Sequence, residues 1–519
     1  MPLTGRTGSI NKSSSTCVPQ RLPSSAASSE ESSSRCCLIT GATGFVGLNL
    51  IERILTQGSE LFSRILIVTR CKNGSNVQNI FQYLPKHLVN VLESRIEVIE
   101  CDLSSKSSSM STSSATSPGD AAAIPSSTLH EALKHVPTID VIFHLLHINE
   151  NDVVGSGKKR CYFGREFVHM GHQPECRQLH YDLNLRCMDI IIDIASQKCA
   201  ERLVYCSSWS SYGVQPEGTV VSERSLGNDV LKLLNEMQQK KKRKSSLELL
   251  KGQRSVDSSV GDRFVVSDED LIKFVERKQP QIALSFFSLN KEPNPYSVTK
   301  HCCELKLRLA ILSGRIKGGM TIQPTTILGM YSKYHWSKIF HRLLETNGLM
   351  PGIPGSTSVV DVRDLAHIMV RCCYADVDTK DKEEGEEGTS AITSSSFGSG
   401  ECYLVGGENI TNLGLMRMMA KFVNVPAPKS ATPKWLLMML SRWNEFIVTY
   451  TPTTLRHWVM PRLLVRPKLI GSPFTMSKIC QSQKTSGSIR TKSTFGYQPT
   501  PIQDIVGSNY EWLRKVGEL

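Results

Sequence analysis

The chain has 519 residues, a formal net charge of +13 at pH 7, and 40% hydrophobic and 21% charged residues. Its length suffices for one large or two ordinary domains, and its composition is that of a globular protein. No apolar run approaches the roughly 18 residues of a membrane-spanning helix. No mixture of basic and aromatic residues indicates nucleic-acid binding. The sixteen cysteines indicate reduced thiols rather than a small disulfide scaffold.

The first 34 residues are rich in serine and low in complexity, so we predict a disordered N-terminal tail over residues 1–34. This tail lacks the apolar core of a secretory signal, and it carries no acidic residue before Glu30. The same composition fits an organelle transit peptide. We therefore expect a cytoplasmic protein and leave import into an organelle open.

Alternating strand and helix patterns begin at Cys36. Short apolar runs predict strands over 36–40, 65–69, 96–100, 141–145, 202–206 and 320–323. This alternation is typical of an α/β fold with a Rossmann-type, doubly wound parallel sheet. It is lost after about residue 324. We therefore expect a nucleotide-binding domain over 35–324 and a smaller, mixed substrate-binding lobe over 325–519.

Four polar stretches without apolar periodicity interrupt this rhythm, and we predict disordered surface insertions there. They lie near residues 104–127, 151–175, 226–262 and 378–400, the last with an acidic run over 383–387. The second insertion holds four metal-ligand types at a spacing that matches no standard zinc finger, so we expect no metal site. They are Cys161, His169, His172 and Cys176.

A glycine-rich turn between the first strand and the amphipathic helix after it is the most informative local feature. Its three glycines let the chain turn sharply, approach a pyrophosphate closely and pack the helix on the strand, while the helix N-terminus faces the phosphates. We therefore predict a dinucleotide-binding turn. Its cofactor-binding residues are expected to be Gly41, Thr43, Gly44, Phe45, Val46 and Gly47.

Arg70 ends the second strand segment, at the place where an enzyme that prefers NAD carries a carboxylate. A guanidinium suits the 2′-phosphate of NADP instead, so we expect NADP and leave NAD open. Asp102 and Leu103 follow the third strand, where a residue that contacts adenine is expected. A turn-forming aspartate fits the same position.

Two tyrosine and lysine pairs have the spacing that places both side chains on one helix face. They are Tyr296 with Lys300 and Tyr334 with Lys338. A nearby ammonium favours the phenolate and so prepares a tyrosine for proton transfer. We favour the first pair because it follows Asn294-Pro295, a natural helix start, and leads into a helical apolar pattern.

A serine cluster follows the fifth strand in Ser207-Ser208-Trp209-Ser210-Ser211. Ligands of such folds bind at the carboxyl edge of the sheet, so one of these hydroxyls is expected to orient a substrate carbonyl. The composition of the cluster does not decide which one.

Together these segments resemble the extended short-chain dehydrogenase/reductase family from Cys36 to about Gly407. The resemblance rests on the glycine turn in Thr40–Gly47 and on further segments in the family's order. These are 141–144, Asn184 with the helix after it, 203–213, 296–300, 323–329, 362–366 and 403–407. The family implies hydride transfer between a substrate carbon and nicotinamide.

The resemblance also implies roles for individual residues. Tyr296 would pass the proton, Lys300 would hold the ribose and favour the phenolate, and Ser208, with Ser210 as a neighbouring hydroxyl, would bind the substrate oxygen. Pro324 and Leu145 would lie beside the cofactor. Three departures from the family pattern are Leu145-Leu146-His147 in place of small residues, Gln323 in place of an arginine, and a longer interval between Ser208 and Tyr296.

The closing segment Phe495-Gly496-Tyr497-Gln498-Pro499 looks like that of the 3β-hydroxysteroid dehydrogenase branch. This resemblance implies a small apolar substrate of sterol or lipid type. Apolar residues from 435 onward fit a lid over such a substrate, ordinary core packing, or a peripheral membrane contact over 435–470. A homodimer is also compatible with the family.

Other functions share this fold. The segment 64–72 resembles acyl-thioester reductases, which act on fatty acyl carriers. A sugar-nucleotide epimerase would retain NAD without net turnover, and a non-catalytic nucleotide-binding scaffold would need neither Tyr296 nor Lys300.

Overall fold

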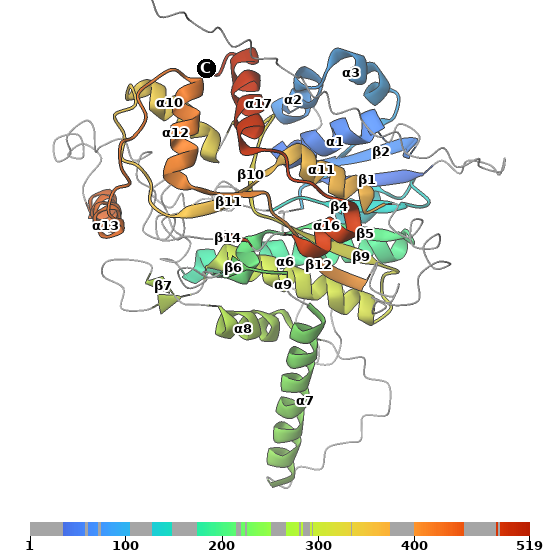
Figure 1. Ribbon diagram of the computed structural model, residues 1–519. Helices are drawn as coiled ribbons and strands as arrows, with labels where there is room; N and C mark the ends of the chain where they lie inside the picture. Colours follow the sequence, from blue (N-terminus) through green and yellow to red (C-terminus); the bar gives the residue numbers. More distant parts are fainter. Residues whose placement is uncertain are drawn as a thin grey trace, which may run out of the picture. The chain divides into compact units, whose positions relative to one another are not determined.

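Seven parallel strands form the central sheet of the protein, here in a computed structural model (Figure 1). In spatial order they are β12 (Ser399–Val405), β9 (Gly319–Pro324), β5 (Arg202–Cys206), β4 (Val141–His144), β1 (Cys36–Thr40), β2 (Arg64–Thr69) and β3 (Ile96–Glu100). The structure describes residues 35–57, 61–70, 74–103, 127–147, 174–213, 220–223, 226–250, 266–279, 282–283, 291–292, 294–333, 335–373, 399–450, 484–485 and 488–519.

The strand order confirms the predicted Rossmann-type topology. From β1 the chain moves outward through β2 to β3, then returns to the other side of β1 and continues through β4, β5, β9 and β12. The order therefore reverses between β1 and β4, and a sheet of this kind binds ligands at the carboxyl ends of its strands beside that reversal.

Helices cover both faces of the sheet (Figure 1). On one face lie α1 (Phe45–Gln57) and α11 (Val362–Arg371), and on the other lie α6 (Pro174–Gln197) and α9 (Pro295–Leu312). Strand β1 is buried on both sides, with Cys37 and Ile39 in one apolar cluster and Cys36 and Leu38 in the other. This double burial explains why the strand is apolar throughout rather than alternating.

The other helices up to α9 are short, apart from α7. They are α2 (Ser75–Tyr83), α3 (Lys86–Glu93), α4 (Ser127–Ala132), the 3₁₀ turn η2 (Trp209–Tyr212), α7 (Leu226–Leu250) and α8 (Asp268–Lys278). Two small two-stranded sheets pair β6 (Val220–Val221) with β14 (Lys484–Thr485) and β7 (Ile282–Ala283) with β8 (Lys291–Glu292).

A second sheet holds the C-terminal part of the chain. Its strands are β10 (Thr326–Leu328), β11 (Ser356–Asp361) and β13 (Glu408–Thr411). The helical elements of this part are η3 (His335–Ser337), α10 (Lys338–Glu345), α12 (Asn412–Phe422), α13 (Lys434–Tyr450), α16 (Ile489–Phe495) and α17 (Ile502–Lys515).

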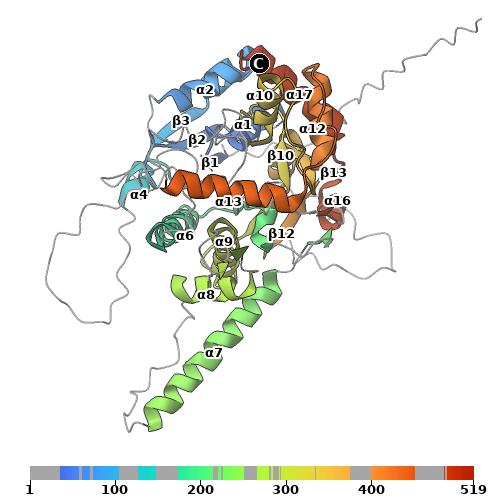
Figure 2. The same cartoon turned by 90° about the vertical axis from the view of Figure 1, so that its left-hand side faces the viewer.

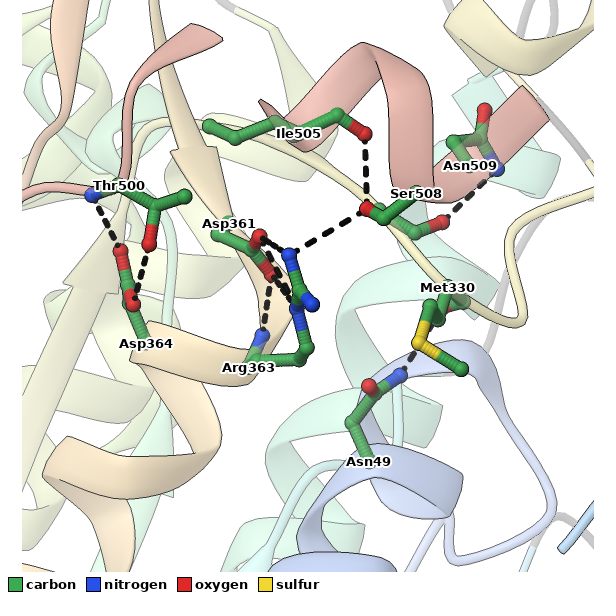
Figure 3. Close-up of polar contacts among 10 residues, drawn as sticks. Asn49, Met330, Asp361, Arg363, Asp364, Thr500, Ile505, Ser508 and Asn509 are labelled. Carbon is green, nitrogen blue, oxygen red and sulfur yellow. Dashed lines mark hydrogen bonds and ion pairs between the residues drawn. The ribbon is translucent and has the colours of Figure 1, made fainter. Parts of the chain in front are cut away.

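Polar side chains tie the last helix to this sheet and to α11 (Figure 3). Arg363 binds the buried Asp361 and donates to Ser508 on α17 at 3.3 Å. Asp364 accepts hydrogen bonds from the backbone and hydroxyl of Thr500, both at 2.9 Å. The C-terminal helix is therefore an integral part of the fold.

The expected boundary at residue 324 does not separate the two sheets. Strand β12 comes from the second part of the sequence, yet it pairs in parallel with β9 in the central sheet. Pairing with β9 buries the backbone of β12, whose residues Cys402 to Val405 are almost fully covered. The second lobe is therefore interrupted by a return of the chain to the nucleotide-binding sheet.

The insertion predicted over 226–262 is also wrong in its first part, because residues 226–250 form helix α7. Val230 and Leu233 are buried in the cluster that contains α9, and Asp229 pairs with Lys278 of α8 at 2.7 Å. A helical apolar spacing is present at Val230, Leu233 and Met237, but it spans only the first part of α7. It is followed by a stretch rich in lysine and glutamine, which by itself predicts an insertion.

Several predicted segments lie outside the described residues. These are the tail over 1–34, most of the insertions near 104–127, 151–175 and 378–400, the residues Cys161, His169 and His172 of the second insertion, and Tyr334 of the second tyrosine and lysine pair. Among the described helices, none is long and apolar enough to cross a bilayer.

Candidate functional site

The glycine turn forms the close-packed junction that the sequence predicts. Gly41 has a φ of +77°, and a Cβ on it would lie 2.9 Å from the backbone nitrogen of Leu146. A Cβ on Gly47 would lie 2.5 Å from the carbonyl oxygens of Gly41 and Ala42. The turn therefore brings the backbone after β4 against the start of α1, and its glycines leave room for a close approach by a pyrophosphate.

The predicted turn residues lie around the end of β1 and the first turn of α1. Gly44 is exposed, and Thr43, Phe45 and Val46 are half-buried around the first turn of α1. Leu145 follows β4 and donates its backbone N–H to the Thr40 carbonyl at 3.1 Å. A dinucleotide fits the donor groups and the open backbone of this turn, although no side chain here identifies which dinucleotide.

Arg70, Asp102 and Leu103 lie at the carboxyl ends of neighbouring strands. Arg70 is exposed directly after β2, and Asp102 is half-buried just after β3, with Leu103 buried beside it. Thr69 and Glu100, at the ends of β2 and β3, are register partners in the sheet. These three residues therefore share the sheet edge of the glycine turn, on the side of β1 away from β4.

Tyr296 and Lys300 lie in the first turns of α9. The side chain of Asn294 caps this helix by accepting from the Tyr296 backbone N–H at 2.9 Å, and Pro295 occupies the first helical position. The Lys300 ammonium lies 5.8 Å from the centroid of the Tyr296 ring. It is 3% exposed and donates to the carbonyl oxygen of Cys206 at 2.9 Å. The helix thus holds the pair at the carboxyl end of β5.

Ser208 lies two residues beyond that strand end. Its hydroxyl caps η2 by accepting from the Ser210 backbone N–H at 3.1 Å, and its side chain is half-buried. Helix α9 packs against η2, which places the serine segment beside the tyrosine and lysine pair. The capping bond leaves the hydroxyl proton of Ser208 available to a substrate oxygen.

A buried polar network lies beneath these residues. Glu304 on α9 is fully buried and accepts hydrogen bonds from Ser207 and from Gln323, the latter at 2.8 Å. Gln323 in turn accepts from the Tyr212 hydroxyl at 2.8 Å. Gln323 therefore connects β9 to α9 and η2. It also fixes the end of β9, where the next residue is the buried Pro324.

Three buried histidines lie close enough to the Lys300 ammonium to be affected by its charge. Burial, and to a lesser degree the Lys300 charge, lowers the pKa of His144 to about 3 and that of His180 to about 4. The same causes hold the pKa of His147 well below its usual range. All three imidazoles are therefore neutral at physiological pH. His147 lies against the Tyr296 ring, with centroids 4.7 Å apart.

The structure thus brings together the three predicted catalytic residues and the glycine turn along one sheet edge. Sequence reasoning missed the Glu304 network because nothing in a helical pattern marks one buried carboxylate. It noted His147 as a departure from small residues but assigned it no role. Among the described residues, no group of three histidine, cysteine or acidic side chains is placed to hold a metal ion.

Comparisons with known proteins give a family match over part of the chain. Residues 39–117 match an NAD-binding family model described as male sterility protein. This span contains the glycine turn, Arg70, Asp102 and Leu103. No curated protein matches the sequence significantly.

The chain is distantly similar to several solved structures. UDP-glucuronic acid 4-epimerase from Bacillus cereus, in complex with UDP-glucuronic acid and NAD, is 14% identical with a TM-score of 0.47, covering 93% of this chain and 99% of its own. dTDP-glucose 4,6-dehydratase from Bacillus anthracis is 12% identical with a TM-score of 0.46, covering 93% and 98%. The fold assignment comes from the strand order described above.

Replacing Gly47 tests the close packing of the turn. Because a Cβ here would overlap two carbonyl oxygens, Gly47→Ala is expected to lower the free energy of unfolding by about 1–3 kcal/mol and to weaken NADPH binding. Urea denaturation and fluorescence titration with NADPH measure the two effects. Gly507→Ala on α17 is the matched control, since it lies outside the turn and its nearest contact would be the Phe422 side chain at 3.3 Å. Equal NADPH affinity in Gly47→Ala and the wild type would contradict the assignment of the turn.

Proposed function

We propose that the protein is an NAD(P)-dependent oxidoreductase of the extended short-chain dehydrogenase/reductase type. The observation that carries this proposal is the buried Lys300 ammonium, bonded to the end of β5 and adjacent to Tyr296, at the same sheet edge as the glycine turn. The family match over residues 39–117 supports a nucleotide at that turn. The strand order supports it independently, because the turn lies at the topological reversal.

In this proposal the bound nicotinamide supplies or accepts a hydride at the substrate carbon. The Tyr296 hydroxyl donates a proton to the substrate oxygen in reduction and takes it back in oxidation. The Ser208 hydroxyl donates a hydrogen bond to the same oxygen. The Lys300 ammonium is held by Cys206, so it stabilises negative charge on the phenol without being able to swing away.

We propose an apolar substrate of sterol or lipid type whose hydroxyl and carbonyl forms are interconverted. The support is the apolar helix α13, which turns Trp435 and Met439 toward solvent, 68% and 52% exposed. The segment at Phe495 and Tyr497 that suggested the steroid branch is buried, and Phe495 packs on Tyr403 at 5.1 Å. That segment therefore stabilises the fold and does not itself bear on the substrate.

Removing the Tyr296 hydroxyl tests the reaction. Tyr296→Phe is expected to lower turnover by about 100- to 10,000-fold, with NADPH binding retained, because the ring still packs while the proton donor is lost. The assay follows NADPH absorbance with a panel of sterols and a panel of acyl-CoA thioesters. Activity confined to the thioesters would overturn the sterol proposal in favour of an acyl-thioester reductase.

Tyr510→Phe is the matched control for that loss. Tyr510 lies on α17, where its ring packs against Phe340 and Phe422 at 5.8 and 5.7 Å. This change removes the same atom from an element that carries none of the proposed catalytic residues. Full activity in Tyr296→Phe would contradict the oxidoreductase mechanism and favour a nucleotide-binding scaffold.

Arg70 allows the proposed preference for NADP to be tested. Its guanidinium is exposed at the end of β2, the position from which a cation reaches a 2′-phosphate. Arg70→Ala is expected to raise the Kd of NADPH about tenfold or more, while the Kd of NADH stays unchanged. Fluorescence titrations with both nucleotides measure this ratio. An equal rise in the Kd of NADPH and the Kd of NADH would show that Arg70 does not bind the 2′-phosphate.

We also propose a peripheral contact between α13 and an anionic membrane surface. Trp435, Met439 and Trp443 recur every four residues, so they share one face of the uninterrupted helix drawn in orange in Figure 2. All three are more than half exposed. The sequence from 446 to 503 contains eight lysines and arginines and no acidic residue. Exposed tryptophans followed by a basic segment favour an anionic interface.

Vesicle flotation tests this contact. Vesicles that contain phosphatidylserine are expected to bind the wild type, and the double change Trp435→Gln with Trp443→Gln is expected to weaken binding about tenfold. Leu349→Gln is the control, since Leu349 is an exposed apolar residue, 79% accessible, outside α13. Equal flotation of the wild type and the tryptophan variant would exclude α13 as the contact.

A further inference from the structure

Two histidines beside Tyr296 have no part in the proton transfer described above. His147 follows β4, and its ring stands edge to face against Tyr296. His180 lies on α6, is 1% exposed, and its ring centroid lies 5.1 Å from that of His147. Two imidazoles from different elements therefore meet at the proposed proton donor.

Each histidine has one buried nitrogen without a hydrogen-bond partner in the described part of the chain. This nitrogen is Nε2 in both His147 and His180. Buried polar atoms in folded proteins are nearly always satisfied by protein, water or ligand. Two unsatisfied nitrogens on rings whose centroids are 5.1 Å apart therefore mark a place where a ligand atom or a water is expected.

His144 shows what a structural histidine looks like at the same sheet edge. Its Nδ1 bonds to the Thr40 hydroxyl at 2.7 Å, and its ring stacks on Tyr205 with centroids 5.6 Å apart. His144 thus fills a place in the core and has a protein partner. The rings of His147 and His180 are packed in a similar way, but among the described residues their Nε2 atoms have no hydrogen-bond partner.

The hydrogen-bond role of His180 follows from its other nitrogen. The Asn184 amide donates to the His180 Nδ1 at 3.4 Å, so Nδ1 is an acceptor and carries no proton. A neutral imidazole has one N–H, which therefore lies on Nε2. His180 must then donate from Nε2. Among the described residues no hydrogen bond selects the tautomer of His147, which can therefore take either role.

We propose that His147 and His180 form a polar subsite against the Tyr296 ring, which binds a hydroxyl oxygen of the substrate or of the nucleotide ribose. A hydroxyl accepts from the His180 N–H and satisfies either tautomer of His147, because it both donates and accepts. Burial, together with the Lys300 charge, keeps these imidazoles neutral, and the same conditions disfavour a cation here. This inference rests on the proposed function for the nature of the ligands.

Isosteric substitutions distinguish a binding role from a packing role. His147→Leu and His180→Leu retain apolar volume but remove the nitrogen, whereas His147→Gln and His180→Gln retain an amide donor at a similar reach. We expect each leucine variant to weaken ligand binding about tenfold and each glutamine variant to restore most of it. His87→Leu, at an exposed position of α3, is the matched control.

Two measurements distinguish a hydroxyl of the substrate from a hydroxyl of the nucleotide ribose. The Kd of NADPH is measured by fluorescence without substrate, and KM is measured with the best substrate of the sterol and acyl-CoA panels at saturating NADPH. A rise in Kd in the leucine variants assigns the hydroxyl to the ribose. A rise confined to KM assigns it to the substrate.

Two outcomes overturn the subsite while leaving the oxidoreductase proposal intact. In one, folded leucine variants match the active wild type in both Kd and KM. In the other, leucine and glutamine variants are equally impaired, which indicates packing alone. Conversely, a wild type that binds NADPH through these histidines but oxidises or reduces nothing in either panel overturns the proposed function and not the subsite.

Discussion

The burial of the Lys300 ammonium is the constraint on which the site depends. A charge that is 3% exposed requires a polar partner, and the Cys206 carbonyl at 2.9 Å provides one at the end of β5. The bond holds the first turns of α9 at the sheet edge, and with them Tyr296. The same charge adds to burial in keeping three neighbouring histidines neutral. The one contact therefore fixes the cation beside Tyr296, while burial supplies most of the effect that keeps the histidines neutral.

Close packing at the glycine turn is the second constraint on the site. Gly41 approaches the backbone of Leu146, so the segment after β4 lies directly against the glycine turn. The next residue, His147, reaches the Tyr296 ring. A single short segment after β4 thus connects the place for the nucleotide with the proposed reacting centre. The buried network of Glu304 and Gln323 supports the serine segment from below.

Local patterns failed where long-range packing decided the structure. Helix α7 begins with a short apolar repeat followed by a lysine-rich stretch, and Val230 and Leu233 of that repeat are buried against a surface built from α9 and other elements. Strand β12 follows a long polar stretch, and its apolar pattern fits either sheet, so its sequence does not reveal whether it joins the central sheet or the second sheet. Its pairing with β9 depends on the exposed edge that β9 offers, which exists in the folded sheet alone.

The sequence by itself determined the parallel sheet, the glycine turn and the positions of Ser208, Tyr296 and Lys300, because strand periodicity, turn glycines and helix-start residues act over a few neighbouring positions. Tertiary structure alone decided that β12 returns to the first sheet, that Lys300 bonds to Cys206, and that His147 meets His180 beside Tyr296. These contacts join residues far apart in the chain, and their partners are selected by shape and burial rather than by any local pattern.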